Sequence, residues 1–231
     1  MRRRGDICLP ESVKEIFFFD RHYHRGPEFY LSHFHPLDQH ILAMELTTTA
    51  FDVPEAPRNA YNLLGQEIKL ICPLRDPVDR ALAVYHDYLH YGIVSGPIAE
   101  AVDQAPQILF GSRYADHLER WLERFGKQQV EIFFYEALEK DPAGFARQVC
   151  DFLAVPYITP APDIHLTPMH SLPVAKPRLG TILDGFVGAN KKSGQESRRN
   201  TPDIKWLIER LSDEQERLEK LIGRVIPYWR S

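Results

Sequence analysis

The sequence lacks long hydrophobic runs. No stretch approaches the roughly 18 consecutive apolar residues that a membrane-spanning helix requires. The opening segment, MRRRGDICLP, has the basic end of a signal peptide, but no apolar region follows it. We therefore expect a soluble, cytoplasmic protein that has no membrane partner.

Cysteine is also scarce, and its positions carry no motif. The three cysteines, Cys8, Cys72 and Cys150, are too few and too scattered for a disulfide framework, which fits a reducing compartment. The sequence contains no HExxH motif, and histidine pairs such as His22 and His24 have no cysteine or second carboxylate at ligand spacing. We predict that the protein binds no metal.

Neither sign of charge dominates. Lysine and arginine number 28 against 32 acidic residues, which gives a net charge of −4. A generic nucleic-acid partner is therefore disfavoured, and an anionic ligand has to be bound by a local group of cations. Hydrophobic residues make up 44% of the chain, enough to bury a core, so residues 1–231 are predicted to form a single domain.

Short apolar runs alternate with segments of helical periodicity, which favours an α/β fold with a central, mainly parallel sheet flanked by helices. The predicted strands are residues 15–19, 41–46, 68–74 and 130–135. The predicted helices are residues 78–91 and 114–125, a helix that starts at Asp141-Pro142, and a last helix over about 203–223. Residues 159–201 form a long, proline-rich and then basic segment, for which a loop over a substrate or a cofactor is predicted.

The strongest local signal is a strand followed at once by a proline-started helix. Arg75 is placed at the carboxyl end of the strand, beside the helix N-terminus, where α/β sheets bind anionic ligands. This position favours a phosphate-binding role. The alternative is an ion pair with Asp76 or Asp79.

Several motifs together resemble a known family. The segment Arg75-Asp76-Pro77-Val78-Asp79-Arg80 is similar to the 3′-phosphate-binding motif of sulfotransferases that use 3′-phosphoadenosine 5′-phosphosulfate (PAPS). Lys14 to Asp20 (KEIFFFD) resembles a segment of the heparan sulfate 3-O- and N-sulfotransferase group. Similarity continues, in the same order, through Gly111 to His117, Trp121, Asp141 to Gly144 and Asp151 to Leu153. The resemblance covers about residues 9–155 and implies the P-loop-NTPase-like fold of these enzymes.

The resemblance also implies an acceptor site. It gives Glu15 the role of the base that takes the proton from the acceptor, and Asp20 that of a second acid lining the site. From the residues alone, the favoured interpretation of Glu15 is an acid paired with Lys14 or an arginine, and that of Asp20 is an ordinary turn residue. The acceptor implied is a hydroxyl or amine of a glycan or a small molecule.

The nucleotide site implied by the resemblance begins at Arg75, which would hold the 3′-phosphate of PAPS, and includes Arg80. Tyr114 is expected to face the adenine nucleotide, with a core position as its alternative. Three cations of the basic segment, Lys192, Arg198 and Arg199, are expected to close over the nucleotide, with a solvated loop as the alternative. A homo-oligomer is left open.

The sequence departs from the family at three places. Ala83 stands where the family has a serine that shares the 3′-phosphate, and Leu46 stands where it has a lysine near the reaction centre. The lysine- and Gly-Thr-containing loop that holds the 5′-phosphosulfate, and the strand before it, are expected upstream of Leu9 and are missing from the sequence given. Three alternative functions are considered. The first is a catalytically impaired protein, N-terminally incomplete or degenerate, that still binds a glycan or a nucleotide. The second is another nucleotide enzyme, and the third is an interaction protein in which a partner fills the place of the absent strand.

Overall fold

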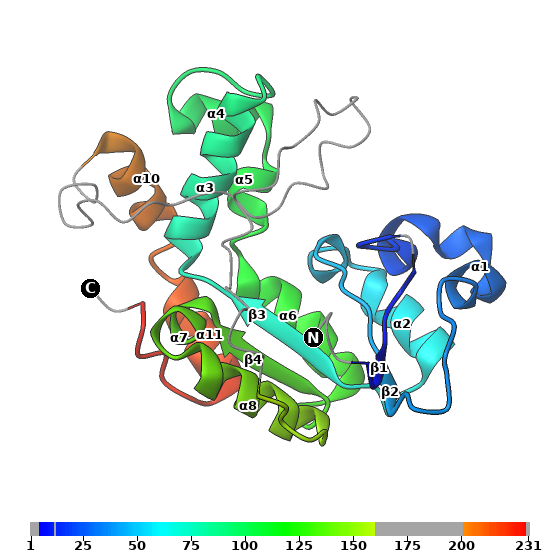
Figure 1. Ribbon diagram of the computed structural model, residues 1–231. Coiled ribbons are helices and arrows are strands. Elements are labelled where there is room, and N and C mark those ends of the chain that lie inside the picture. The colour runs from blue at the N-terminus through cyan, green and yellow to red at the C-terminus, as the bar shows by residue number, and fades with distance from the viewer. Residues whose placement is uncertain (1–4, 12, 160–200, 230–231) are drawn as a thin grey trace. The chain divides into compact units, whose positions relative to one another are not determined.

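The structure is a computed structural model, and it describes residues 5–11, 13–159 and 201–229 (Figure 1). The basic segment with Lys192, Arg198 and Arg199 lies outside the described residues, and so does most of the predicted irregular region 159–201. The described chain has four strands: β1 (Ile7–Cys8), β2 (Leu42–Ala43), β3 (Leu70–Leu74) and β4 (Val130–Phe134). Within the described ranges no helix has the length and apolar character that crossing a membrane requires.

Helices supply most of the regular structure. They are α1 (Pro27–Leu31), α2 (Ala56–Leu64), α3 (Pro77–His90), α4 (Ile98–Gln104), α5 (Gln107–Phe110), α6 (Tyr114–Phe125), α7 (Tyr135–Lys140), α8 (Pro142–Leu153), α10 (Pro202–Arg210) and α11 (Glu214–Ile222). A π-helical turn, η1 (Phe18–His22), and two 3-10 turns, η2 (Tyr23–Arg25) and η3 (Thr49–Phe51), complete the set.

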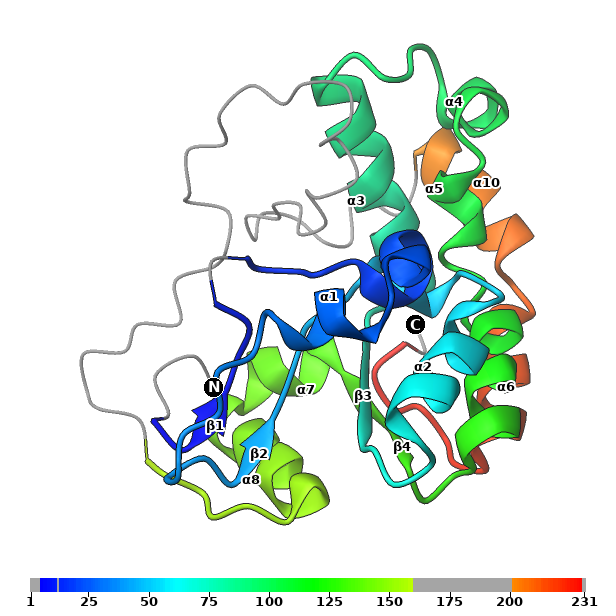
Figure 2. The same cartoon turned by 90° about the vertical axis from the view of Figure 1, so that its right-hand side faces the viewer.

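The strands form two hydrogen-bonded pairs. β1 lies parallel to β2, with Ile7 opposite Leu42 and Cys8 opposite Ala43 (Figures 1 and 2). β3 pairs with β4 in a second two-stranded sheet. The α/β class with parallel strands is confirmed, and the strands predicted at residues 68–74 and 130–135 are present with slightly shorter bounds.

The chain divides into two compact units, each described by itself. Unit 1 comprises Met1–Ile71, His117–Glu131 and Gln148–Pro156, and unit 2 comprises Cys72–Asp116, Ile132–Arg147 and Tyr157–Ser231. The division falls within β3, β4, α6 and α8, so these elements contribute residues to both units.

The strand predicted over residues 15–19 is wrong. Phe17 has a left-handed backbone with φ 53°, and the chain turns there into η1. The turn places the consecutive Phe18 and Phe19 rings edge to face, 5.3 Å apart, and both pack on Tyr30 of α1. The side-chain nitrogen of Asn59 in α2 donates to the Phe19 carbonyl at 2.9 Å, which satisfies a backbone acceptor that a sheet would otherwise pair.

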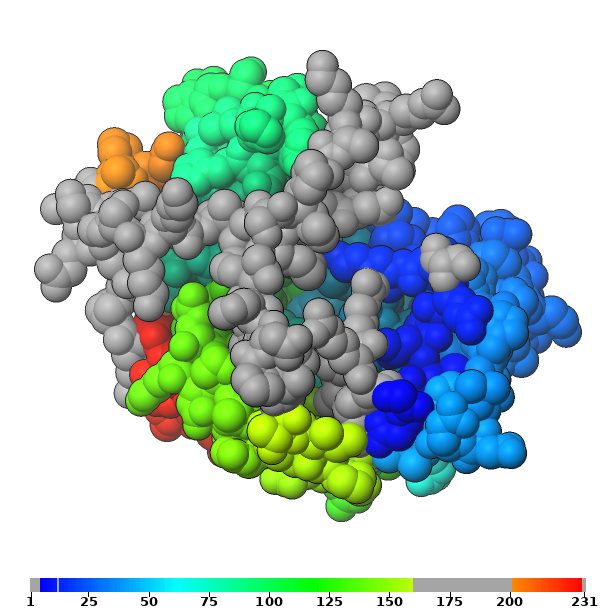
Figure 3. All heavy atoms as spheres, viewed as in Figure 1, coloured from blue at the N-terminus to red at the C-terminus, as the bar shows by residue number. Residues whose placement is uncertain are grey.

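The core of unit 2 is built by helices. Apolar side chains of α3, α4, α5 and α10 form one buried cluster that includes Ala81, Tyr85, Ile98, Ile108 and Leu207. Figure 3 shows the outer face of the α3 and α4 region, in blue-green, as one continuous surface. The single helix predicted over residues 203–223 is two helices, because the chain turns between Leu211 and Asp213.

The C-terminal helix α11 is fixed to the start of α6 by buried polar contacts. Glu214 is fully buried, and its Oε1 accepts the Ala115 amide at 2.6 Å. Arg217, one turn further along α11, pairs with Asp116 and with Glu214. The C-terminal helix α11 therefore contributes structurally to unit 2.

Candidate functional site

Unit 1 contains the predicted acceptor acids. Glu15 lies just before η1, and its side chain is 5% exposed. Its Oε2 accepts two hydrogen bonds from Thr48, one from the backbone amide at 3.2 Å and one from Oγ1 at 2.9 Å. Lys14 lies beside the same carboxylate, with 3.7 Å between its Nζ and Glu15 Oε1. The ion pair considered from the sequence therefore exists, but it is long, and Lys14 is half exposed.

Asp20 is held in the same way by Thr49, the residue that follows Thr48. Its side chain is 2% exposed, and its Oδ2 accepts a hydrogen bond of 2.5 Å from Thr49 Oγ1. Arg21 Nε lies 3.5 Å from that oxygen. Asp20 is therefore not an ordinary turn residue in solvent, but a buried carboxylate oriented by a hydroxyl group and a cation.

A third carboxyl group lies with these two and was missed in the sequence. The pKa of Glu45 is raised to about 7, mainly by burial, with smaller increases from the negative charges of Asp20 and Glu15 and an opposing effect from the Tyr30 hydroxyl. Burial and the nearby Glu45 together raise the pKa of Tyr30 above its ordinary value. No local feature of the sequence around Glu45 indicates that its side chain is buried.

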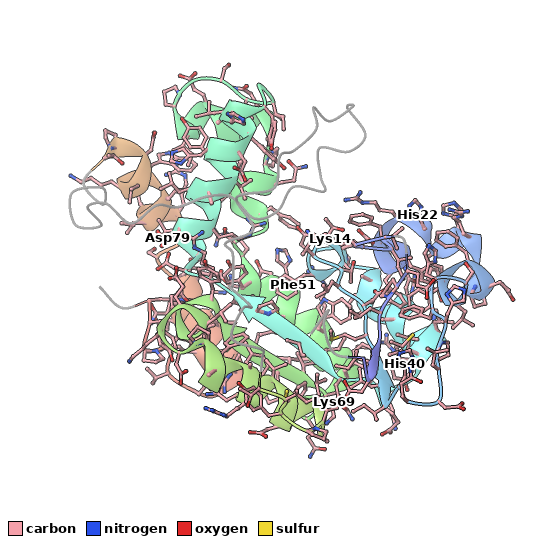
Figure 4. All side chains as sticks on the ribbon, in the orientation of Figure 1. Lys14, His22, His40, Phe51, Lys69 and Asp79 are labelled. Atoms are coloured by element: carbon pink, nitrogen blue, oxygen red, sulfur yellow. The ribbon has the colours of Figure 1, made fainter. Side chains whose placement is uncertain are left out.

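Unit 2 contains the predicted phosphate-binding arginine. Arg75 follows β3, and its side chain is 24% exposed. Its guanidinium lies 5.5 Å from the ring centre of Tyr135. Asp79 on the first turn of α3, labelled in Figure 4, pairs with this guanidinium, with 3.8 Å between Arg75 Nη2 and Asp79 Oδ2. A partly exposed pair at this distance is weak, so the guanidinium remains available to an anion.

The N-terminus of α3 adds little to anion binding. Pro77 has no amide hydrogen, and the Asp76 side chain accepts the amides of Val78 and Asp79 at 2.9 and 3.0 Å. The Asp76 amide itself donates to Glu136 Oε1 at 2.8 Å. The sequence-based expectation that this helix end supports anion binding is therefore weakened, because its amides are already capped. The attraction for an anion comes from the Arg75 side chain.

Arg80 is held inside unit 2 and is not a solvated helix charge. Its Nη1 donates to Ser112 Oγ at 3.3 Å. A Cβ atom on Gly111 would lie 2.1 Å from Arg80 Nη2, so the guanidinium occupies the space that the missing side chain leaves. Any contact of Arg80 with a nucleotide stays a prediction.

Tyr114 occupies the core position that the sequence left as its alternative. Its side chain is 3% exposed, and its ring centre lies 6.1 Å from that of Trp229. Burial raises the pKa of its hydroxyl above the ordinary value, against the opposing effect of Arg80. A direct contact between Tyr114 and the nucleotide stays a prediction, and its burial does not favour it.

Two groups of candidate residues are thus described. In unit 1 the threonines of one loop orient Glu15 and Asp20, and in unit 2 Arg75 presents a partly exposed guanidinium where β3 gives way to α3. Oriented carboxylates suit proton transfer, and a guanidinium suits phosphate binding.

Comparison with known proteins gives a consistent family. The sequence model described as the sulfotransferase domain matches residues 2–214. The mouse protein named bifunctional heparan sulfate N-deacetylase/N-sulfotransferase 1 is 30% identical over 248 residues, which cover 95% of this chain and 27% of that protein. The mouse heparan sulfate glucosamine 3-O-sulfotransferase 3A1 is 31% identical over 189 residues, covering 77% of this chain and 47% of that protein. The chain therefore spans about a quarter to a half of the length of these relatives.

Among solved structures, a sulfotransferase from Alicyclobacillus acidocaldarius aligns with a TM-score of 0.69 at 20% identity, over 99% of this chain and 90% of that one. This likeness establishes the fold. Because the family model covers most of the sequence, the chain belongs to the sulfotransferase domain family.

Proposed function

We propose that the protein transfers a sulfuryl group from PAPS to a hydroxyl or amine group of a glycan or a small molecule. The observation that carries this proposal is the pair of carboxylates in unit 1. Glu15 and Asp20 are both almost fully buried, and consecutive threonines of one loop hold them. Membership of the sulfotransferase family supports the choice of the transferred group.

In the proposed reaction Glu15 is the general base. As the acceptor oxygen or nitrogen forms a bond to sulfur, the proton of that atom passes to Glu15, and the bond between sulfur and the bridging phosphate oxygen breaks. Both hydrogen bonds from Thr48 go to Oε2, so Oε1 remains the oxygen that can accept the proton. Asp20 is proposed to orient the acceptor.

Arg75 is the proposed ligand of the 3′-phosphate of PAPS. The guanidinium is partly exposed and only weakly engaged by Asp79, which fits a side chain that binds an anion through two parallel hydrogen bonds. The capped amides of α3 leave this task to the arginine itself. Arg80, Tyr114, Lys192, Arg198 and Arg199 are proposed as further nucleotide contacts on the family resemblance alone.

A second candidate function is binding without turnover. It is favoured by Leu46, an exposed apolar side chain at the position where the family has a lysine near the reaction centre. A cation at the reaction centre stabilises the charge that develops on the departing phosphate, so its loss lowers the rate more than the affinity. A cytoplasmic location is proposed for either function, on the sequence alone.

A transfer assay separates the two functions. The protein is incubated with radiolabelled PAPS and with hydroxyl- and amine-bearing glycans, and labelled product is counted. We expect product with the unmodified protein, a loss of about 100-fold or more with Glu15→Gln, and full activity with the control Glu67→Gln, which changes an exposed acid of the same unit. Nucleotide binding without product supports the second function, and equal transfer by Glu15→Gln contradicts the role of Glu15.

A further inference from the structure

The loop over Glu45, Thr47, Thr48 and Thr49 has an organising role in unit 1. Thr48 holds Glu15 through its amide and hydroxyl, and Thr49 holds Asp20 through its hydroxyl. The residue that opens this loop, Glu45, is itself an acid. One short segment therefore contributes the supports of two carboxylates and also the third carboxylate beside them.

The polar atoms around Glu45 are buried and incompletely hydrogen-bonded. Among the described residues, neither carboxyl oxygen of Glu45 forms a hydrogen bond of regular geometry, and the same is true of Asp20 Oδ1 and Thr47 Oγ1. Each of these atoms is shielded from solvent. A buried carboxylate with few donors besides the Tyr30 hydroxyl is costly to ionise, and a proton held within the group removes part of that cost.

Three neighbouring segments bring charged or titratable side chains to Glu45. Asp20 of η1 and Glu15 of the preceding segment are negative, and the Tyr30 hydroxyl of α1 is neutral. The cations of the cluster are Arg21, which lies on Asp20, and the half-exposed Lys14, which lies on Glu15. Three carboxylates against two cations leave an excess negative charge when all three are ionised.

We propose that Glu45 is a positioning residue that holds a proton in this cluster and, by releasing it, sets the pH range in which Glu15 acts as a base. This inference rests on the proposed function. While Glu45 is protonated, the cluster is balanced by Lys14 and Arg21. Once Glu45 ionises, the added negative charge strengthens the attraction of the cluster for the acceptor's proton.

The electrostatics agree with this geometry. Burial is the main reason that the pKa of Glu45 rises to about 7, and the charge of Asp20 adds to it. The group therefore changes charge near neutral pH, where it can affect a reaction under ordinary conditions.

The direct test is a carboxyl titration by NMR of protein labelled with ¹³C at glutamate Cδ. One glutamate signal should titrate near pH 7 and be absent from Glu45→Gln. The Glu15 signal, assigned with Glu15→Gln, should show a step at the same pH in the unmodified protein and none in Glu45→Gln. The control Glu67→Gln should retain both features. The proposal is overturned if no glutamate titrates above about pH 6, or if the Glu15 signal has no step near pH 7.

The second test is the pH profile of transfer. The kcat/KM of the unmodified protein should rise through about pH 7, and Glu45→Gln should lose the rise and be about fivefold slower at pH 8. Glu45→Asp should restore the rise. The proposal is overturned if Glu45→Gln keeps the rise through about pH 7, whether or not its rates are lower. A structural role alone would lower the rate equally at every pH and leave the shape of the profile unchanged.

Failure of the inference differs from failure of the proposed function. Transfer activity without the NMR signal at pH 7 removes Glu45 from the reaction and leaves the function in place. The NMR signal without transfer to any acceptor overturns the proposed function, and with it the assignment of Glu45 to a reaction.

Discussion

The pH dependence of stability gives a quantitative prediction for Glu45. The pKa of its carboxyl rises from 4.5 to about 7 in the folded protein, mainly because of burial. At about 1.4 kcal/mol per pH unit, this shift corresponds to about 3 kcal/mol. That value is the most that ionising Glu45 can cost the folded state.

The sign follows from proton binding. Below pH 4.5 Glu45 is protonated in the folded and in the unfolded chain, and its ionisation does not affect stability. Between pH 4.5 and about 7 the folded state keeps the proton that the unfolded state has released, so the folded state loses stability as the pH rises. Above about pH 7 the whole cost is present.

Glu45→Gln removes this cost with a side chain of the same size. Relative to the unmodified protein, the variant should be about equally stable at pH 4.5 and more stable by up to about 3 kcal/mol at pH 8. For a chain of this length the gain corresponds to a rise in Tm of about 2–4 °C per kcal/mol. Thermal unfolding followed by circular dichroism at several pH values measures it.

The control for this series is Glu67→Gln, whose exposed side chain should give no pH-dependent difference. A difference between Glu45→Gln and the unmodified protein that stays constant from pH 5 to pH 8 refutes the reasoning. Such a result means that Glu45 is ionised throughout and that the cluster tolerates its charge.

Three further predictions concern individual contacts. Thr48→Val removes the 2.9 Å hydrogen bond to the Glu15 carboxylate and should lower kcat about tenfold, whereas Thr48→Ser should retain the activity; equal rates for both variants contradict the role of the hydroxyl. Gly111→Ala places a Cβ in the space of the Arg80 guanidinium and should cost about 1 kcal/mol of stability by breaking the bond to Ser112. That loss should vanish in an Arg80→Ala background, and a loss that persists there in urea unfolding argues against the contact. Asp79→Asn removes the acid that pairs with Arg75 and should tighten binding of adenosine 3′,5′-bisphosphate about two- to fivefold in calorimetry, whereas weaker binding implies that Asp79 orients the guanidinium.

Much of the helical structure follows from local signals in the sequence. Asp76 and Pro77 predict the start of α3, and the structure shows the Asp76 side chain capping it and Pro77 in its first turn. The apolar spacing from Tyr114 to Phe125 predicts α6, because helical periodicity is a strong signal over twelve residues. These elements depend on residues near one another in the chain.

Features that depend on distant contacts were not predicted. The run Phe17 to Phe19 has the composition of a buried strand, but in the structure Phe18 packs on Tyr30 and the Phe19 carbonyl accepts from Asn59, and both partners are distant in the sequence. Glu15 and Asp20 were found through a family resemblance. Glu45 was missed because its burial comes from tertiary packing around Tyr30, which leaves no trace near residue 45.

The central claim is that Arg75 binds a phosphate on the ribose 3′ position. Calorimetry with adenosine 3′,5′-bisphosphate and with adenosine 5′-monophosphate tests it in the unmodified protein and in Arg75→Ala. The account predicts tighter binding of the bisphosphate, by about tenfold or more, and loss of that preference in Arg75→Ala with little change for the monophosphate. Equal affinities for the two nucleotides in the unmodified protein, or an unchanged preference in Arg75→Ala, would contradict it.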